Sequence, residues 1–248
     1  MRIPAATVRL AIASFAVLTL ALMGAEPVQG VQLTVNYFGD HHSSGCDPFN
    51  FGPPFQACTL REAIEEANAT AAADEIRFQP PGDGPGTVFV ISPTPTNPLP
   101  PITQPVTLGG GMLMAGYIRI NGSGAGNDVN GLTVASSGVS ISDMAIYNFD
   151  GNGIHVNGGS GHSFTNLYLG NTDGATAAPN GERGIRIDSS SNNQILFSVI
   201  GPNAISGILV ANGTNNSLIQ GNYVGTNATG ANLGNGIGIQ LDDSVYGI

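Results

Sequence analysis

Short segments of alternating apolar residues recur through the second half of the chain. Each begins with glycine and continues with an apolar residue, any residue and a second apolar residue. The five segments are Gly131-Leu-Thr-Val, Gly153-Ile-His-Val, Gly184-Ile-Arg-Ile, Gly207-Ile-Leu-Val and Gly238-Ile-Gln-Leu. Alternation with a period of two residues is typical of short strands with one buried face.

The spacing of these glycines favours a solenoid. Successive steps are 22, 31, 23 and 31 residues, so Gly153 to Gly207 and Gly184 to Gly238 both span 54 residues. The longer steps contain an insert at 170–180 and at 225–235. A coil of about 22 residues that contributes one strand to each of three parallel sheets explains this pattern. An all-β sandwich explains the strands but not the 54-residue period, so we predict a parallel β-helix over 87–248.

One helix is predicted upstream of the coils. Thr59 and Glu62 form a capping box, and an apolar stripe follows it. The stripe consists of Leu60, Ala63, Ile64 and Ala67. The opposite face is polar and consists of Arg61, Glu62, Glu65 and Glu66. We expect the helix to end between Asn68 and Ala73 and to cover the N-terminal end of the solenoid, within a cap region spanning 31–86. The strands expected next are Glu75–Phe78, Thr87–Ile91, Val106–Leu108 and Tyr117–Ile120.

The first 30 residues resemble a signal peptide. Arg2 and Arg9 precede an apolar run over 10–25 that is short for a membrane span. Small residues follow, and cleavage is expected after Ala25 or Gly30; the alternative is an uncleaved N-terminal anchor. We therefore expect a secreted or cell-surface protein with no membrane span after cleavage.

Composition and charge exclude several classes of function. Charged residues make up 10% of the 248 residues, and the net charge is −10. This acidic balance disfavours nucleic acid and anionic membranes as partners. The seven basic residues are all Arg, so a P-loop, which requires Lys, is absent.

Cys46 and Cys58 are the two cysteines, twelve positions apart. In an oxidising compartment we predict that they form a disulfide. The alternative is a metal site completed by His41 and His42, but no zinc-binding spacing occurs.

The segment Cys58-Thr-Leu-Arg-Glu-Ala-Ile64, followed by Ala67-Asn68, resembles the CSLREA motif of a group of exported bacterial proteins. The similarity extends over about residues 31–248 and includes Gly221-Asn-Tyr-Val-Gly-Thr-Asn-Ala-Thr-Gly230. It implies a right-handed parallel β-helix with an N-terminal α-helical cap, on a secreted or surface-attached protein, and no single activity. Such proteins usually continue beyond the point where this chain stops, so we expect a fragment.

Stacked coils place the outward residues of successive strands in two rows. One row contains Thr133, His155, Arg186, Leu209 and Gln240, and the other Ala135, Asn157, Asp188, Ala211 and Asp242. His155, Arg186 and Asp188 are the catalytic candidates, because His or Arg can act as a base beside a carboxylate. Asn157, Arg186, Asp188 and Asp242 are the candidate ligand-binding residues. We expect no metal cofactor, although Asp188 and Asp242 could hold Ca²⁺ that bridges to an acidic glycan.

Two classes of function remain open. The first is a non-catalytic scaffold that contacts polysaccharide or cell-envelope components. The second is a carbohydrate-active enzyme of the pectate-lyase-like β-helix type: a polysaccharide lyase, epimerase or glycoside hydrolase. For the outer face itself, the alternative to both is a solvated sheet whose polar residues have no ligand.

Overall fold

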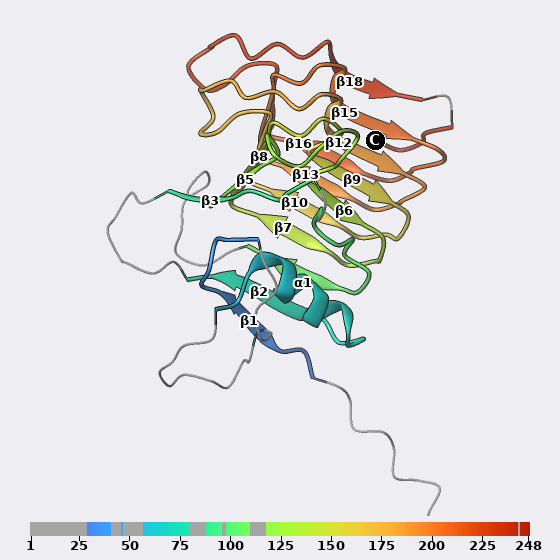
Figure 1. Ribbon diagram of the computed structural model, residues 1–248. Helices are drawn as coiled ribbons and strands as arrows, with labels where there is room; N and C mark the ends of the chain where they lie inside the picture. Colours follow the sequence, from blue (N-terminus) through green and yellow to red (C-terminus); the bar gives the residue numbers. More distant parts are fainter. Residues whose placement is uncertain are drawn as a thin grey trace, which may run out of the picture.

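The chain forms three all-parallel sheets that wind around one apolar core (Figure 1). The computed structural model describes residues 29–40, 46, 57–79, 88–95, 98–109, 118–242 and 244–248. Nearly all of the predicted signal peptide, together with His41, His42 and Tyr117, lies outside these ranges. Among the described residues, no helix is long and apolar enough to cross a membrane.

The seven-stranded sheet has the order β1-β2-β4-β7-β10-β13-β16. Its strands are β1 (Gln32–Val35), β2 (Asp74–Phe78), β4 (Val106–Leu108), β7 (Ser140–Ser142), β10 (Ser163–Thr165), β13 (Gln194–Leu196) and β16 (Leu218–Gln220). The six-stranded sheet has the order β17-β14-β11-β8-β5-β3. It contains β3 (Phe89–Ile91), β5 (Ile118–Asn121), β8 (Met144–Tyr147), β11 (Tyr168–Leu169), β14 (Val199–Ile200) and β17 (Tyr223–Val224).

The five-stranded sheet has the order β18-β15-β12-β9-β6 and contains the glycine-led segments. Its strands are β6 (Leu132–Val134), β9 (Ile154–Asn157), β12 (Arg183–Asp188), β15 (Ser206–Ala211) and β18 (Ile237–Leu241). From β4 onward each coil therefore passes through the seven-, six- and five-stranded sheets in turn, and the coils stack along one axis (Figure 1). The predicted parallel β-helix is confirmed, and the predicted strands match within two residues.

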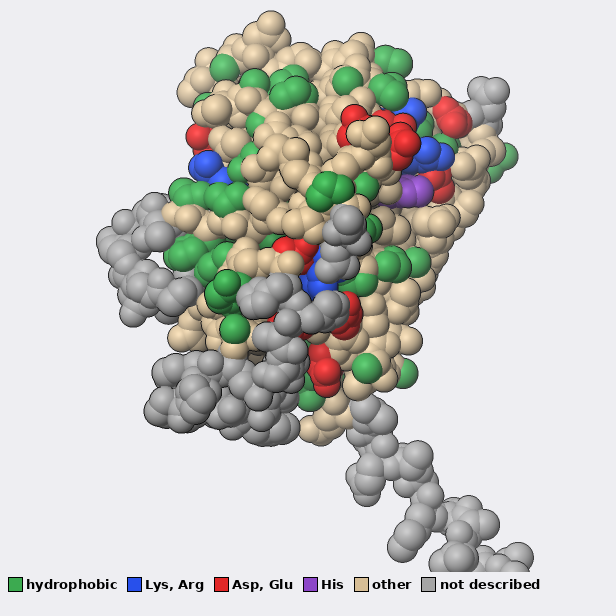
Figure 2. Space-filling model, viewed as in Figure 1, with side chains coloured by type: hydrophobic (Ala, Val, Ile, Leu, Met, Phe, Trp, Pro, Cys, Tyr) green, Lys and Arg blue, Asp and Glu red, His purple; other side chains and the backbone are tan. Residues whose placement is uncertain are grey.

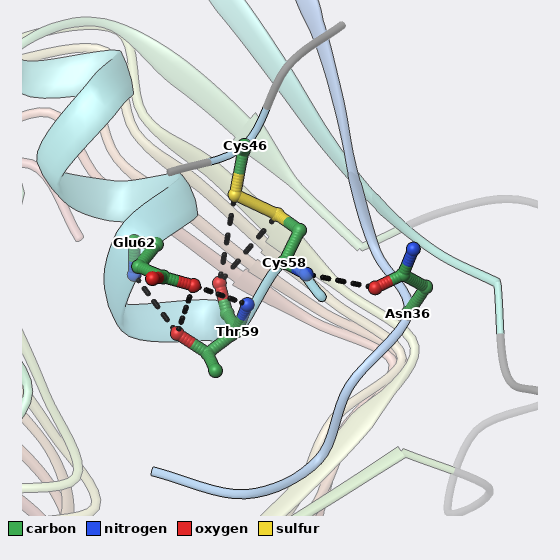
Figure 3. Close-up of a disulfide and its surroundings, with 5 residues drawn as sticks. All are labelled: Asn36, Cys46, Cys58, Thr59 and Glu62. Carbon is green, nitrogen blue, oxygen red and sulfur yellow. Dashed lines mark hydrogen bonds between the residues drawn. A yellow bond between two sulfur atoms is a disulfide. The ribbon is translucent and has the colours of Figure 1, made fainter. Parts of the chain in front are cut away.

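The helix α1 (Leu60–Asn68) packs against β1 and β2 at the N-terminal end of the stack (Figure 1). Thr59 caps it: its side chain accepts a hydrogen bond from the Glu62 amide, and a Glu62 carboxylate oxygen accepts one from the Thr59 amide at 3.0 Å. The disulfide between Cys46 and Cys58 lies beside this cap, and the Cys58 amide donates to Asn36 Oδ1 (Figure 3). Both the capping box and the disulfide agree with the sequence prediction.

The prediction of a polar, solvent-facing side of the helix is partly wrong. Arg61 and Glu62 are buried rather than exposed. The Arg61 guanidinium forms a two-pronged ion pair with Asp40 and donates to the Pro98 carbonyl oxygen. Burial of the arginine is tolerated because its charge is matched and its donors have acceptors. The helix is thus held to the first coils by an ion pair as well as by its apolar stripe.

The inward columns of the five-stranded sheet have the predicted register. Ile154, Ile185 and Ile208 stack on one another, as do Val156, Ile187 and Val210, and all six are fully buried. Ile239 and Leu241 continue the two columns, because they pair in register with Ile208 and Val210 of β15, but they are 45% and 51% exposed. Their strand, β18, is the edge strand of the five-stranded sheet in the described part of the chain.

This difference gives a matched pair of core substitutions. Ile187→Ala should lower the free energy of unfolding by about 2–5 kcal/mol, because it opens a cavity between two coils. Ile239→Ala should cost only about 1 kcal/mol, because almost half of that side chain is already in water. Chemical denaturation of both variants measures the difference; equal losses would contradict the register and the burial described here.

Candidate functional site

The outward side chains of β9 and β12 converge on the carboxylate of Asp188. Arg186 is paired with His155 across neighbouring coils, and Asp188 with Asn157. His155 Nε2 lies 2.9 Å and Arg186 Nε 2.6 Å from the same Asp188 oxygen, Oδ2. Histidine, basic and acidic side chains lie next to one another at this edge of the molecule, and other charged side chains lie lower on the same face and at the opposite edge (Figure 2). The three catalytic candidates are therefore in direct contact.

Asn212 completes the cluster and was not predicted. Its side-chain amide donates to the other carboxylate oxygen, Asp188 Oδ1, at 2.8 Å. Asn212 lies one residue beyond β15 and adopts a left-handed backbone conformation with φ 53°. Its place in an Asn-rich corner was visible in the sequence, but an Asn suited to a turn gives no signal that its amide reaches a neighbouring coil.

The environment of Asp188 keeps it ionised. Its side chain is 7% exposed, and this burial alone would raise its pKa. Hydrogen bonds from His155 and Arg186, together with their charges, outweigh burial and hold the pKa of Asp188 below its usual 3.8. A carboxylate with this pKa accepts hydrogen bonds and cannot donate a proton near neutral pH.

The remaining candidate residues are not part of the cluster. Asn157 is exposed, and its side chain has no hydrogen-bond partner among the described residues. Asp242 lies two coils from Asp188, beyond Ala211, and its only side-chain contact in the described ranges is Gln240, at 3.5 Å. Leu209 follows Arg186 in the same row but is only 4% exposed. That part of the outer face is therefore apolar, and the Leu209 side chain is not accessible to a ligand.

The geometry does not favour a Ca²⁺ ion bridging Asp188 and Asp242, the alternative to a site without metal. Both oxygens of Asp188 already accept hydrogen bonds, and Asp242 is too far along the stack to share an ion with it. In the part of the chain that the structure describes, no three His, Cys, Asp or Glu side chains lie close enough together to hold a metal ion.

The free hydrogen-bonding groups of the cluster belong to Arg186 and His155. Arg186 uses Nε for Asp188, and its two terminal nitrogens have no partner within the described ranges, with one third of the side chain exposed. His155 points Nε2 at Asp188, and its other ring nitrogen, Nδ1, has no hydrogen-bond partner within the described ranges. The site thus presents a guanidinium fork and a ring nitrogen on a flat sheet.

Buried polar residues elsewhere have structural roles. Asn180, Asn203 and Asn235 form a ladder at one corner, each amide bonding to the next at 3.0 Å. His162 is buried at another corner: its Nδ1 accepts from the Val139 amide, and its other ring nitrogen faces the Gly158 carbonyl. Burial lowers the pKa of His162, so it remains neutral near pH 7. These contacts tie coils together and leave no group for a ligand.

Comparison with known proteins adds no functional label. No protein-family model matches the chain, and a search of curated proteins finds no match. Function must therefore be inferred from the site itself.

The cluster predicts a pH-dependent contribution to stability. Asp188→Asn should lower the free energy of unfolding by about 1–3 kcal/mol at pH 7, because three donors lose an ionised acceptor. Since the folded-state pKa is depressed, the difference from wild type should be complete above about pH 5 and should shrink as the pH falls below 3.8.

Denaturation curves recorded from about pH 7 to about pH 3 measure this effect. Asp242→Asn is the matched control, because that carboxylate is exposed on the last coil. A stability loss for Asp188→Asn that does not change with pH would contradict the electrostatic role of the carboxylate.

Proposed function

We propose that the protein is an exported β-helix scaffold that binds a polysaccharide bearing carboxylate or sulfate groups along its five-stranded sheet. The observation that carries the proposal is the guanidinium of Arg186: Asp188 fixes its Nε side, and its terminal nitrogens have no partner within the described ranges. A guanidinium fork matches the two oxygens of a carboxylate or sulfate group.

The shape of the surface supports an extended ligand. Outward residues on successive strands of a parallel sheet repeat at about 4.8 Å, so the row through Thr133, His155 and Arg186 runs along the stack axis. A polymer chain can follow such a row, whereas a small molecule finds no enclosing walls. Asn157 and the free nitrogen of His155 are additional partners for sugar hydroxyls.

Export and surface location belong to the same proposal. They are supported by the signal-like N-terminus, by the similarity of the segment at Cys58–Ile64 to the CSLREA motif, and by the disulfide, which persists in oxidising compartments. A net charge of −10 makes the protein a poor partner for anionic surfaces in general, so recognition must be local to Arg186.

A second candidate function is polysaccharide lyase activity. The observation that favours it is the His155–Asp188 pair, in which the carboxylate orients the ring and leaves Nδ1 as a base. In that reaction Nδ1 removes the proton from the carbon beside a uronate carboxylate. The electron pair of that C–H bond forms a C=C double bond as the glycosidic C–O bond breaks, and the leaving oxygen takes a proton from water. Hydrolysis is disfavoured, because it needs a protonated carboxyl and Asp188 is held ionised.

Binding assays with polygalacturonate, alginate and dextran sulfate test the proposal. Arg186→Ala should weaken binding about tenfold or more, because it removes the bidentate partner. Arg77→Ala is the matched control: it removes the same charge from β2, where Arg77 pairs with Glu75 on another sheet. Binding should weaken with added salt and should be unaffected by EDTA.

Three results would refute parts of this proposal. If the wild-type protein binds none of the three polymers, the binding proposal is wrong. If EDTA abolishes binding, Ca²⁺ rather than Arg186 is the link. Unsaturated products in the same mixtures, detected by ultraviolet absorbance and lost in His155→Ala, would establish the lyase instead of the passive scaffold.

A further inference from the structure

Phe197 has a left-handed backbone conformation, with φ 51°, that polar residues or glycine adopt at the equivalent position of the neighbouring coils. The residue that follows each strand of the seven-stranded sheet has positive φ in five successive coils: Gly109, Asp143, Asn166, Phe197 and Gly221. Of the nine non-glycine residues with positive φ in the described ranges, eight are Asp, Asn or Ser, and the ninth is Phe197. A left-handed conformation is unfavourable for a bulky side chain, so Phe197 is locally strained.

Burial does not compensate for this strain. Phe197 is 61% exposed. Its ring lies over Gly221 of the next coil, where an added Cβ would come within 2.6 Å of the ring. Asn166 in the preceding coil instead uses its left-handed position to donate to Asp143 at 2.7 Å, a ladder that Phe197 cannot continue. An exposed aromatic ring held at a strained position is a recognised mark of a functional site.

Two other exposed apolar side chains lie on β16 and β17, the strands on either side of Gly221. Tyr223 is 43% exposed and is paired with Val199, two residues after Phe197, while Leu218 is 46% exposed on the adjoining strand. Gln220, paired with Leu196, and Gln194, paired with Leu218, are also exposed, and their side-chain amides have no partner among the described residues. No charged residue occurs in 194–200 or 218–224. The surface therefore combines rings, free amides and no charge.

These properties define the ligand. The exposed parts of Phe197, Leu218 and Tyr223 amount to on the order of 300 Å², well below the roughly 800 Å² per partner of a stable protein interface. Flat rings beside free amides suit a pyranose, whose C–H face packs on an aromatic ring while its hydroxyls hydrogen-bond at the edge. The lack of charge favours a neutral sugar.

We propose that Phe197 and Tyr223, with the side-chain amide of Gln220, form a stacking site for a neutral saccharide at the corner between the seven-stranded and six-stranded sheets. This site is on a different part of the molecule from the Asp188 cluster and does not depend on it.

Calorimetric titration of the full chain with cellohexaose, mannohexaose and chitohexaose tests the site. The wild-type protein should bind at least one of them, and Phe197→Asn should weaken that binding tenfold or more. The same substitution should raise Tm by about 2–4 °C, because Asn adopts the left-handed conformation readily. A variant that gains stability and loses binding is the signature of a strained residue kept for a ligand.

Two control variants show whether binding depends on this corner of the molecule. Tyr246→Ser removes a ring that is 68% exposed on the last coil, near Asn215, and should leave binding unchanged. Arg77→Ala should also leave binding of the neutral hexasaccharides unchanged, because Arg77 is on β2 at the N-terminal end of the stack, away from both proposed sites. Absence of binding to all three sugars, unaltered binding by Phe197→Asn, or a lower Tm for that variant would each overturn the proposal.

Discussion

The structure depends on the close approach of successive coils at a glycine next to the first residue of each strand of the five-stranded sheet. A Cβ built on Gly153 would lie 2.7 Å from the carbonyl oxygen of Gly184, and one built on Gly184 equally close to that of Gly207. None of these glycines has positive φ. They are glycine because there is no space for a side chain, which is a stricter requirement than backbone freedom.

This close packing fixes the pairing of the residues that follow the glycine in each strand with their partners in the next coil. The two residues that follow each glycine place one side chain in the core and the next on the outer face, so neighbouring coils bring their outward residues side by side. The contacts of His155 and Arg186 with Asp188 follow from that register. At the corners, hydrogen bonds between side chains also link the coils, as in the Asn180–Asn203–Asn235 ladder. Each buried amide there has a partner in the next coil, as buried polar groups require. The same repetition makes Phe197 conspicuous, because the residues at the equivalent position of the neighbouring coils are Gly, Asp or Asn.

The fold could be predicted from the sequence because each coil of a solenoid repeats the same pattern of glycine and apolar residues. The glycine spacing, the alternation of Ile and Val, and the capping box at Thr59 are local signals, and each corresponds to the structure. Burial of Arg61 was missed because it depends on Asp40, which is far from it in the sequence. The exposure of Ile239 was missed because the apolar pattern predicts the side of the strand on which a side chain lies, and not what packs over it.

The site was only half visible for a similar reason. The rows of outward residues predicted that His155, Arg186 and Asp188 lie together, since register alone decides this. Asn212 was missed because its amide reaches back from a turn, and the saturation of Asp188, which argues against Ca²⁺, required actual distances. Phe197 carried no sequence signal at all, because an aromatic residue after a strand is ordinary unless its φ is known.

The most direct test of the close-packing claim compares alanine at the same repeat position in an inner and in the last coil. The built Cβ of Gly184 meets Ile200 and the Gly207 carbonyl oxygen at 2.6 and 2.7 Å, whereas that of Gly238 meets nothing closer than 3.9 Å. Measured by chemical denaturation, Gly184→Ala should lower the free energy of unfolding by about 1–3 kcal/mol or more, and Gly238→Ala by less than about 0.5 kcal/mol. Equal effects of the two substitutions would contradict the claim that close coil stacking at these glycines sets the structure.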